Sequence, residues 1–138
     1  MRTGNVLAKY EPSFDNDITL LLSAKKGLKP EAVFDFITIS QFSANLVEQL
    51  LNKTIKTFTK YKEQNTPLDA TVSEKLLKLF ALYDKGTLVF GNVDEFNKWM
   101  ALPSFGLGNQ VPLELLDTIT GIELIAEELT RIAYGDIA

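Results

Sequence analysis

The chain has 138 residues, enough for one or two small domains, and its 46% hydrophobic and 23% charged residues are typical of a soluble globular protein. It contains no cysteine and no histidine, which excludes disulfides and thiolate metal sites and removes the usual general base. No run approaches the roughly 18 apolar residues of a membrane span, and the first residues lack the apolar core of a signal peptide. We therefore expect a cytoplasmic protein that has no membrane partner. The net charge of −4 does not by itself suggest nucleic acid, so charge must be judged locally.

Helix signals dominate the N-terminal half. Residues 1–16 are expected to form a flexible tail with little to bury. Helices are predicted over 17–25 with Gly27 ending the first, over 30–37 beginning at Pro30, over 40–51 capped by Ser40, and from about Thr54 onward. Residues 37–39 could instead be a brief strand, but nothing nearby offers a partner. The apolar stripes are Ile18, Leu21 and Leu22; Val33, Phe34 and Ile37; Val47, Leu50 and Leu51; and Ile55, Phe58 and Tyr61.

A polar linker at residues 64–67 separates this half from a second helical region. Thr71 and Glu74 match a capping box that opens the longest helix, which runs to about residue 90. Further helices are predicted over 93–102, over 112–117 and from a Thr120 and Glu123 cap to about residue 134. The predicted buried side chains are Leu76, Phe80, Tyr83, Thr87 and Phe90; Val93, Phe96 and Trp99 or Met100; and Ile122, Ile125, Leu129 and Ile132. The sequence thus predicts an all-α fold: a tail (1–16), a helix-turn-helix-like bundle (17–68) and a helical C-terminal domain (69–138).

Residues 53–62 carry four lysines and no acid, and short hydroxyl side chains lie between them. On the second helix of a helix-turn-helix pair, such a face could meet DNA phosphates at the major groove. A solvated helix face is the alternative interpretation. Asn52 stands where such a turn usually has glycine, and lysine lacks the bidentate fork that reads guanine. The candidate DNA-binding residues are Lys53, Thr54, Lys56, Thr57, Thr59, Lys60 and Lys62.

The end of the chain is acidic. Residues 112–138 hold six acids against one base, Arg131, a net charge of −5. Such a segment could serve solubility alone, or it could complement a basic partner, with residues 134–138 as a mobile end able to enter a cleft. The nearby run Gly106-Leu107-Gly108 lacks the Lys-Ser/Thr of a phosphate-binding loop, so a tight helix connection is the favoured interpretation.

Several spacings in the C-terminal half match a known pattern. They are 90–92, 96–99, Pro103, 106–108, 112–116, Thr118, Gly121, Leu129, 131–132 and Gly135. This string resembles the toxin-binding domain of the Xre/MbcA/ParS antitoxins, and residues 56–61 and 73–77 are similar to upstream elements of that family. The resemblance spans roughly residues 28–138. The chain departs from the family pattern in the loop, P-S-F-G-L-G-N in place of P-N-P-A-L-G-G, and has lysine for arginine at positions 56 and 60.

The resemblance implies an antitoxin of a type II toxin–antitoxin system whose partner is a RES-domain toxin that consumes NAD or transfers its ADP-ribose. The antitoxin's C-terminal region would cover the toxin's NAD site, and the protein would also bind its own promoter DNA as a homodimer or as a hetero-oligomer with the toxin. Carried over to this chain, the toxin-binding residues are Arg131, Tyr134, Gly135, Asp136 and Ile137. Trp99, Pro103, Gly106 and Gly108 are expected to be mainly architectural.

Occlusion needs no chemistry, so no catalytic residue, cofactor or metal is expected. Glu127 and Glu128 are adjacent on a helix and would point in different directions rather than at one substrate. The alternative hypothesis is a free-standing helix-turn-helix transcriptional regulator, which rests on the lysines of residues 53–62 alone. DNA binding in the absence of any toxin would support it.

Overall fold

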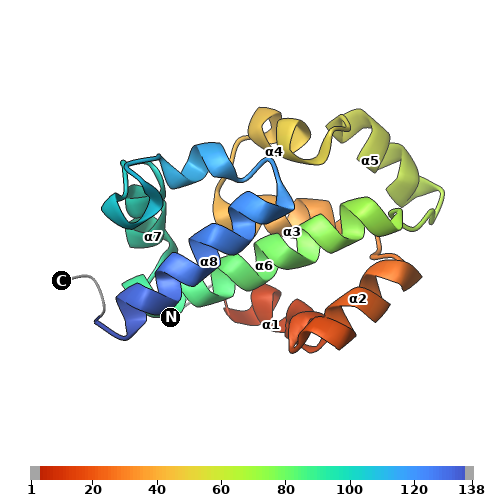
Figure 1. Cartoon of the computed structure of the whole chain (residues 1–138). Coiled ribbons are helices and arrows are strands. Elements are labelled where there is room, and N and C mark those ends of the chain that lie inside the picture. Colours follow the sequence, from red (N-terminus) through yellow and green to blue (C-terminus); the bar gives the residue numbers. More distant parts are fainter. Residues whose placement is uncertain (1–3, 136–138) are drawn as a thin grey trace. The chain divides into compact units, whose positions relative to one another are not determined.

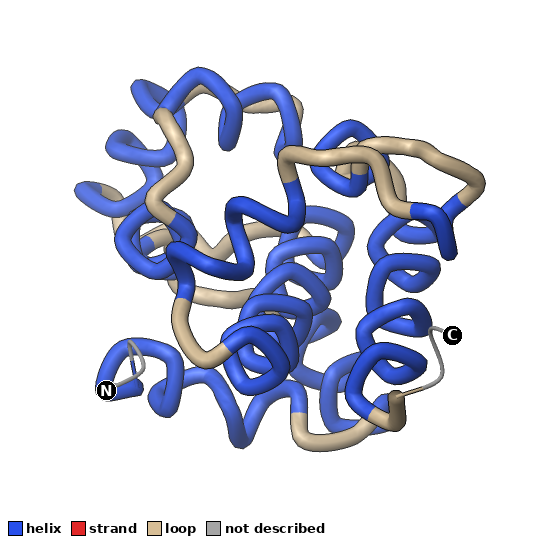
Figure 2. The backbone as a smooth tube through the Cα atoms, turned by 90° about the vertical axis from the view of Figure 1, so that its left-hand side faces the viewer, coloured by secondary structure: helices blue, strands red, loops and turns tan. Residues whose placement is uncertain are grey.

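The structure is a computed structural model and describes residues 4–135, with side chains from Val6 onward. Throughout this range every regular element is helical, which confirms the all-α prediction (Figures 1 and 2). The elements are α1 (Gly4–Phe14), α2 (Asp17–Lys26), α3 (Glu31–Ser40), α4 (Ala44–Leu51), α5 (Ile55–Glu63), α6 (Ala70–Phe90), α7 (Val93–Met100), the 3₁₀ turns η1 (Phe105–Leu107) and η2 (Pro112–Leu115), and α8 (Ile119–Ala133). None of these helices is long and apolar enough to cross a membrane.

The described chain forms two compact units, residues 4–81 and 82–135. The division lies inside α6, so this 21-residue helix contributes its first part to one core and its last part to the other. The compact units therefore do not divide at residue 68, where the sequence placed the end of the helix-turn-helix-like domain. The functional domain limits stay a prediction.

The core of the first unit is built around Phe80 of α6. Its ring stacks on Tyr10 at 4.2 Å between centroids and meets Phe36 edge to face at 5.6 Å. Phe36 and Ile39 of α3 are fully buried, whereas Phe34 and Ile37 of the predicted stripe are only half-buried. Residues 37–39 belong to α3, so the strand alternative is excluded.

The N-terminal segment differs from its prediction as a flexible tail. Residues 4–14 form α1, which buries Leu7 and Tyr10 and packs against α2 and α3. Lys9 and Tyr10 both bond to the carboxylate of Asp35. Two buried side chains three residues apart were enough to add a helix because tertiary contacts, rather than intrinsic propensity, supply most helix stability.

The apolar face predicted for the next helix does not enter the core. α2 buries Leu20 and Ala24, while Ile18, Leu21 and Leu22 are exposed. The packing of α1 against α2 explains the difference, because residues 1–16 were predicted to be a tail and a tail offers no surface for α2 to cover.

Several helix boundaries also differ from prediction. The capping residue is Ser43 rather than Ser40 for α4, Asp69 rather than Thr71 for α6, and Thr118 rather than Thr120 for α8. In each case two candidate caps lie within three residues, and tertiary packing selects between them. The caps at Thr54 and Asn92 are confirmed. The helix from Val93 ends at Met100, two residues before its predicted end, and residues 112–115 form a 3₁₀ turn rather than the predicted helix over 112–117.

The core of the second unit surrounds Phe96 of α7. Its ring lies 4.9 Å from Tyr83, 6.0 Å from Phe90 and 6.1 Å from Trp99, measured between centroids. Gly86 faces the same ring so closely that a β-carbon there would lie 2.3–2.5 Å from its atoms. The glycine therefore lets α6 and α7 approach each other, and α8 closes the unit by packing against η1 and η2.

Candidate functional site

The last helix, α8, has one buried and one exposed face. Its N-terminus is capped by Thr118, whose hydroxyl accepts from the Gly121 N–H at 3.0 Å. Ile122, Ile125 and Leu129 are buried, whereas Leu124 and Glu127 are exposed, so the helix is amphipathic.

The exposed face of α8 continues to the end of the described chain. Leu124, Glu127, Arg131 and Tyr134 follow one another at spacings of three and four residues and so share one side of the helix. Tyr134 is 84% exposed and Gly135 turns the chain with a φ of 71°, which favours glycine. Of the predicted toxin-binding residues, Arg131, Tyr134 and Gly135 therefore lie together, and Asp136 and Ile137 lie outside the described residues.

A partly buried ion pair lies in the last turns of α8. The Arg131 Nε–H donates to Glu128 Oε1 at 2.7 Å, and the side chain of Glu128 is only 4% exposed while that of Arg131 is 43% exposed. A second contact comes from the loop before η2, where a β-carbon on Gly106 would lie 2.0–2.3 Å from the Glu128 carboxylate. The Glu128 carboxylate therefore lies directly against the glycine loop.

The loop between α7 and η2 is held by its own backbone. The Ser104 N–H donates to the Gln110 carbonyl at 2.9 Å, and Gly108 and Asn109 adopt left-handed backbone angles. This is the tight connection favoured by the sequence. The buried Glu128 carboxylate beside Gly106 makes the loop a poor place for a phosphate. At its tip the loop exposes Phe105, whose side chain is 89% accessible to solvent.

A three-residue turn, residues 52–54, connects α4 to α5. Asn52 ends α4 in the left-handed conformation, with φ 58° and ψ 30°, which Asn tolerates better than most residues. Thr54 then caps α5 by accepting from the Thr57 N–H at 3.2 Å. Lys75 of α6 donates to the Leu50 carbonyl at 2.5 Å and so satisfies one end of α4.

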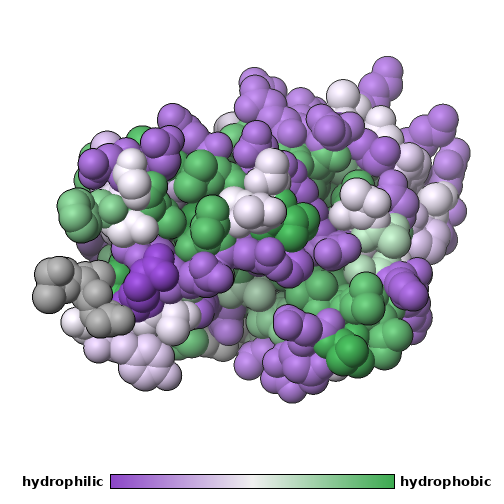
Figure 3. Space-filling model, viewed as in Figure 1, coloured by the Kyte–Doolittle hydropathy of each residue, from purple (hydrophilic) through white to green (hydrophobic). Residues whose placement is uncertain are grey.

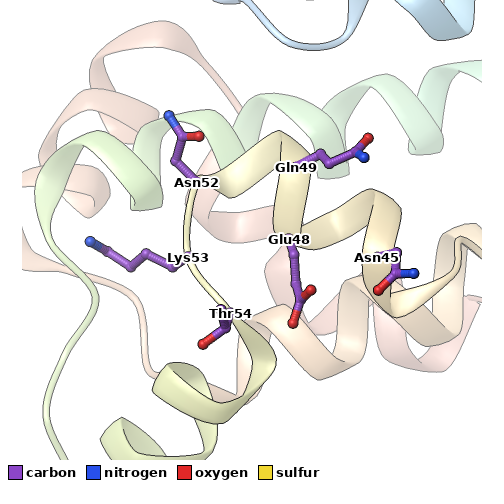
Figure 4. A pocket seen from close by; sticks show the side chains of 6 residues that line it. All are labelled: Asn45, Glu48, Gln49, Asn52, Lys53 and Thr54. Atoms are coloured by element: carbon purple, nitrogen blue, oxygen red, sulfur yellow. The ribbon is translucent and has the colours of Figure 1, made fainter.

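Glu48 adds a feature that the sequence analysis missed. Its Oε2 accepts from the Ile55 N–H at 2.7 Å, so a carboxylate sits at the start of α5 (Figure 4). This position suits the partial positive charge of a helix N-terminus. The same carboxylate would repel a phosphate there, which moves any DNA contact to the side of α5.

The seven candidate DNA-binding side chains divide into three groups. Lys56, Thr59 and Lys60 are exposed on one face of α5 because they are three and four residues apart. Thr54 and Thr57 are engaged in the cap, with their hydroxyl oxygens 3.1 Å apart. The other two have local partners: Lys53 Nζ is 4.0 Å from the Asp69 carboxylate, and Lys62 Nζ is 5.4 Å from the ring centroid of Phe34.

Among residues 4–135, no group of three or more acidic side chains is arranged to hold a metal ion. The two candidate regions are both exposed helix faces: the outer face of α8 with Arg131 and Tyr134, and the lysine face of α5 beside the turn at Asn52.

Comparison with known proteins agrees with the sequence resemblance. Residues 85–135, which run from the last part of α6 through α8, match the model of the antitoxin Xre/MbcA/ParS C-terminal toxin-binding domain. The match agrees with the resemblance that the motif string indicates for the C-terminal region. The chain is also 28% identical over 123 residues, 83% of its length and 77% of the relative's, to the Prs ADP-ribosylating antitoxin of Sphingobium sp. (strain YBL2).

The glycines of the matched segment are needed for different physical reasons. Gly106 makes room for Glu128, as described above. A β-carbon on Gly121 would lie 1.8 Å from the Leu115 carbonyl oxygen, so this glycine lets η2 lie against the first turn of α8. Gly108 and Gly135 have open space around the β-carbon position and are required instead by their positive φ.

Proposed function

We propose that this protein neutralises a RES-type toxin, an enzyme that consumes NAD or transfers its ADP-ribose, by placing its C-terminal end in the toxin's NAD site. The contacts would come from Arg131, Tyr134, Gly135, Asp136 and Ile137. The family match supports a toxin partner, and the observation that carries the finer proposal is the exposed Tyr134 at the end of a helix whose last turn is fixed by the Arg131–Glu128 pair. Because α8 is packed along its buried face, the backbone that presents Tyr134 is already ordered and loses little conformational freedom on binding.

The negative charge of the C-terminal segment also favours a toxin's NAD site as the partner surface. Sites for dinucleotides bind a pyrophosphate and are rich in hydrogen-bond donors and positive charge. The acidic segment of residues 112–138, with its six acids and one base, complements such a surface and would steer association. Occlusion of the cofactor is sufficient for neutralisation, so we propose no catalysis by this chain.

The test is a truncation that stops at Ala133, the last residue of α8. This cut removes the exposed end but keeps the Arg131–Glu128 pair, so the fold should survive. Co-expressed with its toxin, the truncated protein should no longer protect growth or the cellular NAD level, while circular dichroism should remain helical. Glu63→Gln, an exposed change on α5 outside the segment that matches the toxin-binding domain, is the control and should still protect. Full protection by the truncated protein would exclude the proposal.

A second function, repression of its own promoter, is favoured by the helix turn at Asn52 and by the exposed Lys56, Thr59 and Lys60 face. We propose that this face contacts DNA phosphates, because lysine binds phosphate as a point charge and Glu48 occupies the helix N-terminus.

The charge reversals Lys56→Glu and Lys60→Glu separate the two functions. Repression and binding to the upstream DNA should fall, whereas toxin neutralisation should remain. Lys98→Glu, on α7, is a single-reversal control that should leave the DNA affinity within about twofold, to be compared with Lys56→Glu alone. Tight DNA binding without any toxin would favour the free-standing regulator, and unchanged binding after both reversals would contradict a DNA role for α5.

A further inference from the structure

The basic residues of the chain are concentrated in two segments. Residues 18–30 contain three lysines, residues 49–62 contain four, and neither segment contains an acid. Together these short segments hold half of the 14 basic residues of a chain whose net charge is −4. One such segment alone is usually a solvated face, so the position of the two segments in the fold decides their meaning.

The fold places the two segments side by side at one end of the first unit. The Leu28 carbonyl, in the connection between α2 and α3, accepts from the N–H of Leu68, which follows α5, at 2.8 Å. A β-carbon on Gly27 would lie 2.6 Å from the Leu68 carbonyl oxygen. In the other segment, Lys62 Nζ lies 5.4 Å from the ring centroid of Phe34, in the first turn of α3. The α2–α3 connection therefore lies beside the C-terminal end of α5 (Figure 1).

The lysines at this end lack the acidic partners that other basic residues have. Lys9 pairs with Asp35 at 3.0 Å and Lys98 with Glu95 at 3.1 Å. Within residues 4–135, only Lys53 among the lysines of the two segments has such a partner. Figure 3 shows hydrophilic side chains around the end of α5, at the right of the view. The six lysines without an acidic partner are all exposed: Lys25, Lys26, Lys29, Lys56, Lys60 and Lys62.

We infer that the lysines of the α2–α3 junction, Lys25, Lys26 and Lys29, are a second phosphate-contacting element for duplex DNA, beside the lysine face of α5. The inference rests on the proposed contact between α5 and DNA. Duplex DNA fits this surface because its phosphates form a continuous row of negative charge that can meet two separate lysine elements at once. Lysine binds phosphate as a point charge and does not read base edges here, so the junction adds affinity without sequence preference.

The first test measures how the affinity for DNA depends on salt. The full-length protein is titrated by fluorescence anisotropy against its upstream DNA and against an unrelated duplex of equal length, at about 50–200 mM salt. Lys29→Gln should reduce the slope of log K against log salt by about 0.9, and Lys26→Gln with Lys29→Gln by about 1.8. Both duplexes should lose affinity equally. Lys98→Gln, an exposed lysine on α7, is the matched control and should leave the slope unchanged.

The second test locates the contact on the DNA. Hydroxyl-radical footprinting should show one patch of backbone that loses protection with Lys26→Gln and Lys29→Gln, and a different patch that loses protection with Lys56→Gln and Lys60→Gln. A general effect of net charge would instead weaken both patches together and would contradict a direct contact by the α2–α3 junction.

The outcomes separate this inference from the function on which it rests. A wild type that binds neither duplex at any salt would refute both. If Lys56→Gln with Lys60→Gln lowers the slope and Lys26→Gln with Lys29→Gln does not, the contact by α5 stands and the second element is refuted. A loss confined to the upstream DNA would show base reading rather than phosphate contact. Impaired toxin neutralisation with unchanged DNA binding would assign the junction lysines to the toxin and overturn the inference.

Discussion

The pair formed by Glu128 and Arg131 can be tested by removing its exposed partner. Arg131→Ala leaves the Glu128 carboxylate, 4% exposed, without the N–H that now lies 2.7 Å away. Removing one partner of a fully buried pair costs about 3–5 kcal/mol. Because the Arg131 side chain is itself 43% exposed, water can reach the site, and we expect a smaller loss of about 2–3 kcal/mol.

A second variant removes the charge of Glu128 while it keeps the shape of the side chain. Glu128→Gln keeps an oxygen that can accept from Arg131 and loses only the charge-assisted part of the bond, a cost of about 1 kcal/mol. With Arg131→Ala already present, the same change removes the uncompensated charge. The double variant should therefore be more stable than the sum of the single losses predicts, by about 1–2 kcal/mol.

The assay is urea unfolding at neutral pH, followed by the fluorescence of Trp99. This is the only tryptophan of the chain, and its ring lies 5.5 Å from that of Phe90 and 6.1 Å from that of Phe96, so it reports on the second compact unit. If Arg131→Ala costs less than about 0.5 kcal/mol and the two changes are additive, the pair behaves as a surface ion pair and the reasoning fails.

Three further changes probe the packing. Gly121→Ala places a β-carbon 1.8 Å from the Leu115 carbonyl oxygen, and we expect urea unfolding to show a net loss of about 1–2 kcal/mol although alanine is the better helix former. Burial raises the pKa of Tyr83, so the folded state keeps a proton that the unfolded state loses above a pH of about 10. The free energy of unfolding should therefore fall above that pH by up to about 1.4 kcal/mol per pH unit. Tyr83→Phe should remove this part of the slope. Asn52→Ala should cost about 1 kcal/mol in thermal unfolding, whereas Asn52→Gly should be neutral or stabilising.

Each of these changes has a matched control or a contradicting result. Thr120→Ala, at the exposed neighbour of Gly121, should alter stability by less than about 0.5 kcal/mol. Equal alkaline slopes for the wild type and Tyr83→Phe would show that other groups cause the loss. Equal stabilities of the alanine and glycine variants at position 52 would show that the left-handed turn is not under strain.

The sequence predicted burial most accurately in α6, the longest helix. In α6 the period predicts burial of Leu76, Phe80, Tyr83, Thr87 and Phe90; the first four are buried, whereas Phe90 is only half-buried. The pattern succeeded because a 21-residue helix repeats its period often enough to outweigh any single exception. In α2 the period was present but ambiguous, since Leu20 and Leu21 define different faces and only the packing of α1 decides between them.

The candidate site was only partly accessible to sequence reasoning. Arg131 and Tyr134 follow from the motif string. Glu128 does not, because a glutamate in an acidic helix normally faces solvent. Its burial depends on Gly106, which precedes it by 22 residues, and no local pattern reports such a contact. The only available signal was a glutamate three residues before an arginine on the same helix.

The outward-pointing Phe105 has a consequence for the protein in the absence of any partner. Backbone bonds hold the loop in a shape that leaves Phe105 89% exposed, so the free molecule presents this hydrocarbon surface to water. Any protein that shields the ring gains the full benefit of dehydrating it, with no need to straighten or order the loop first.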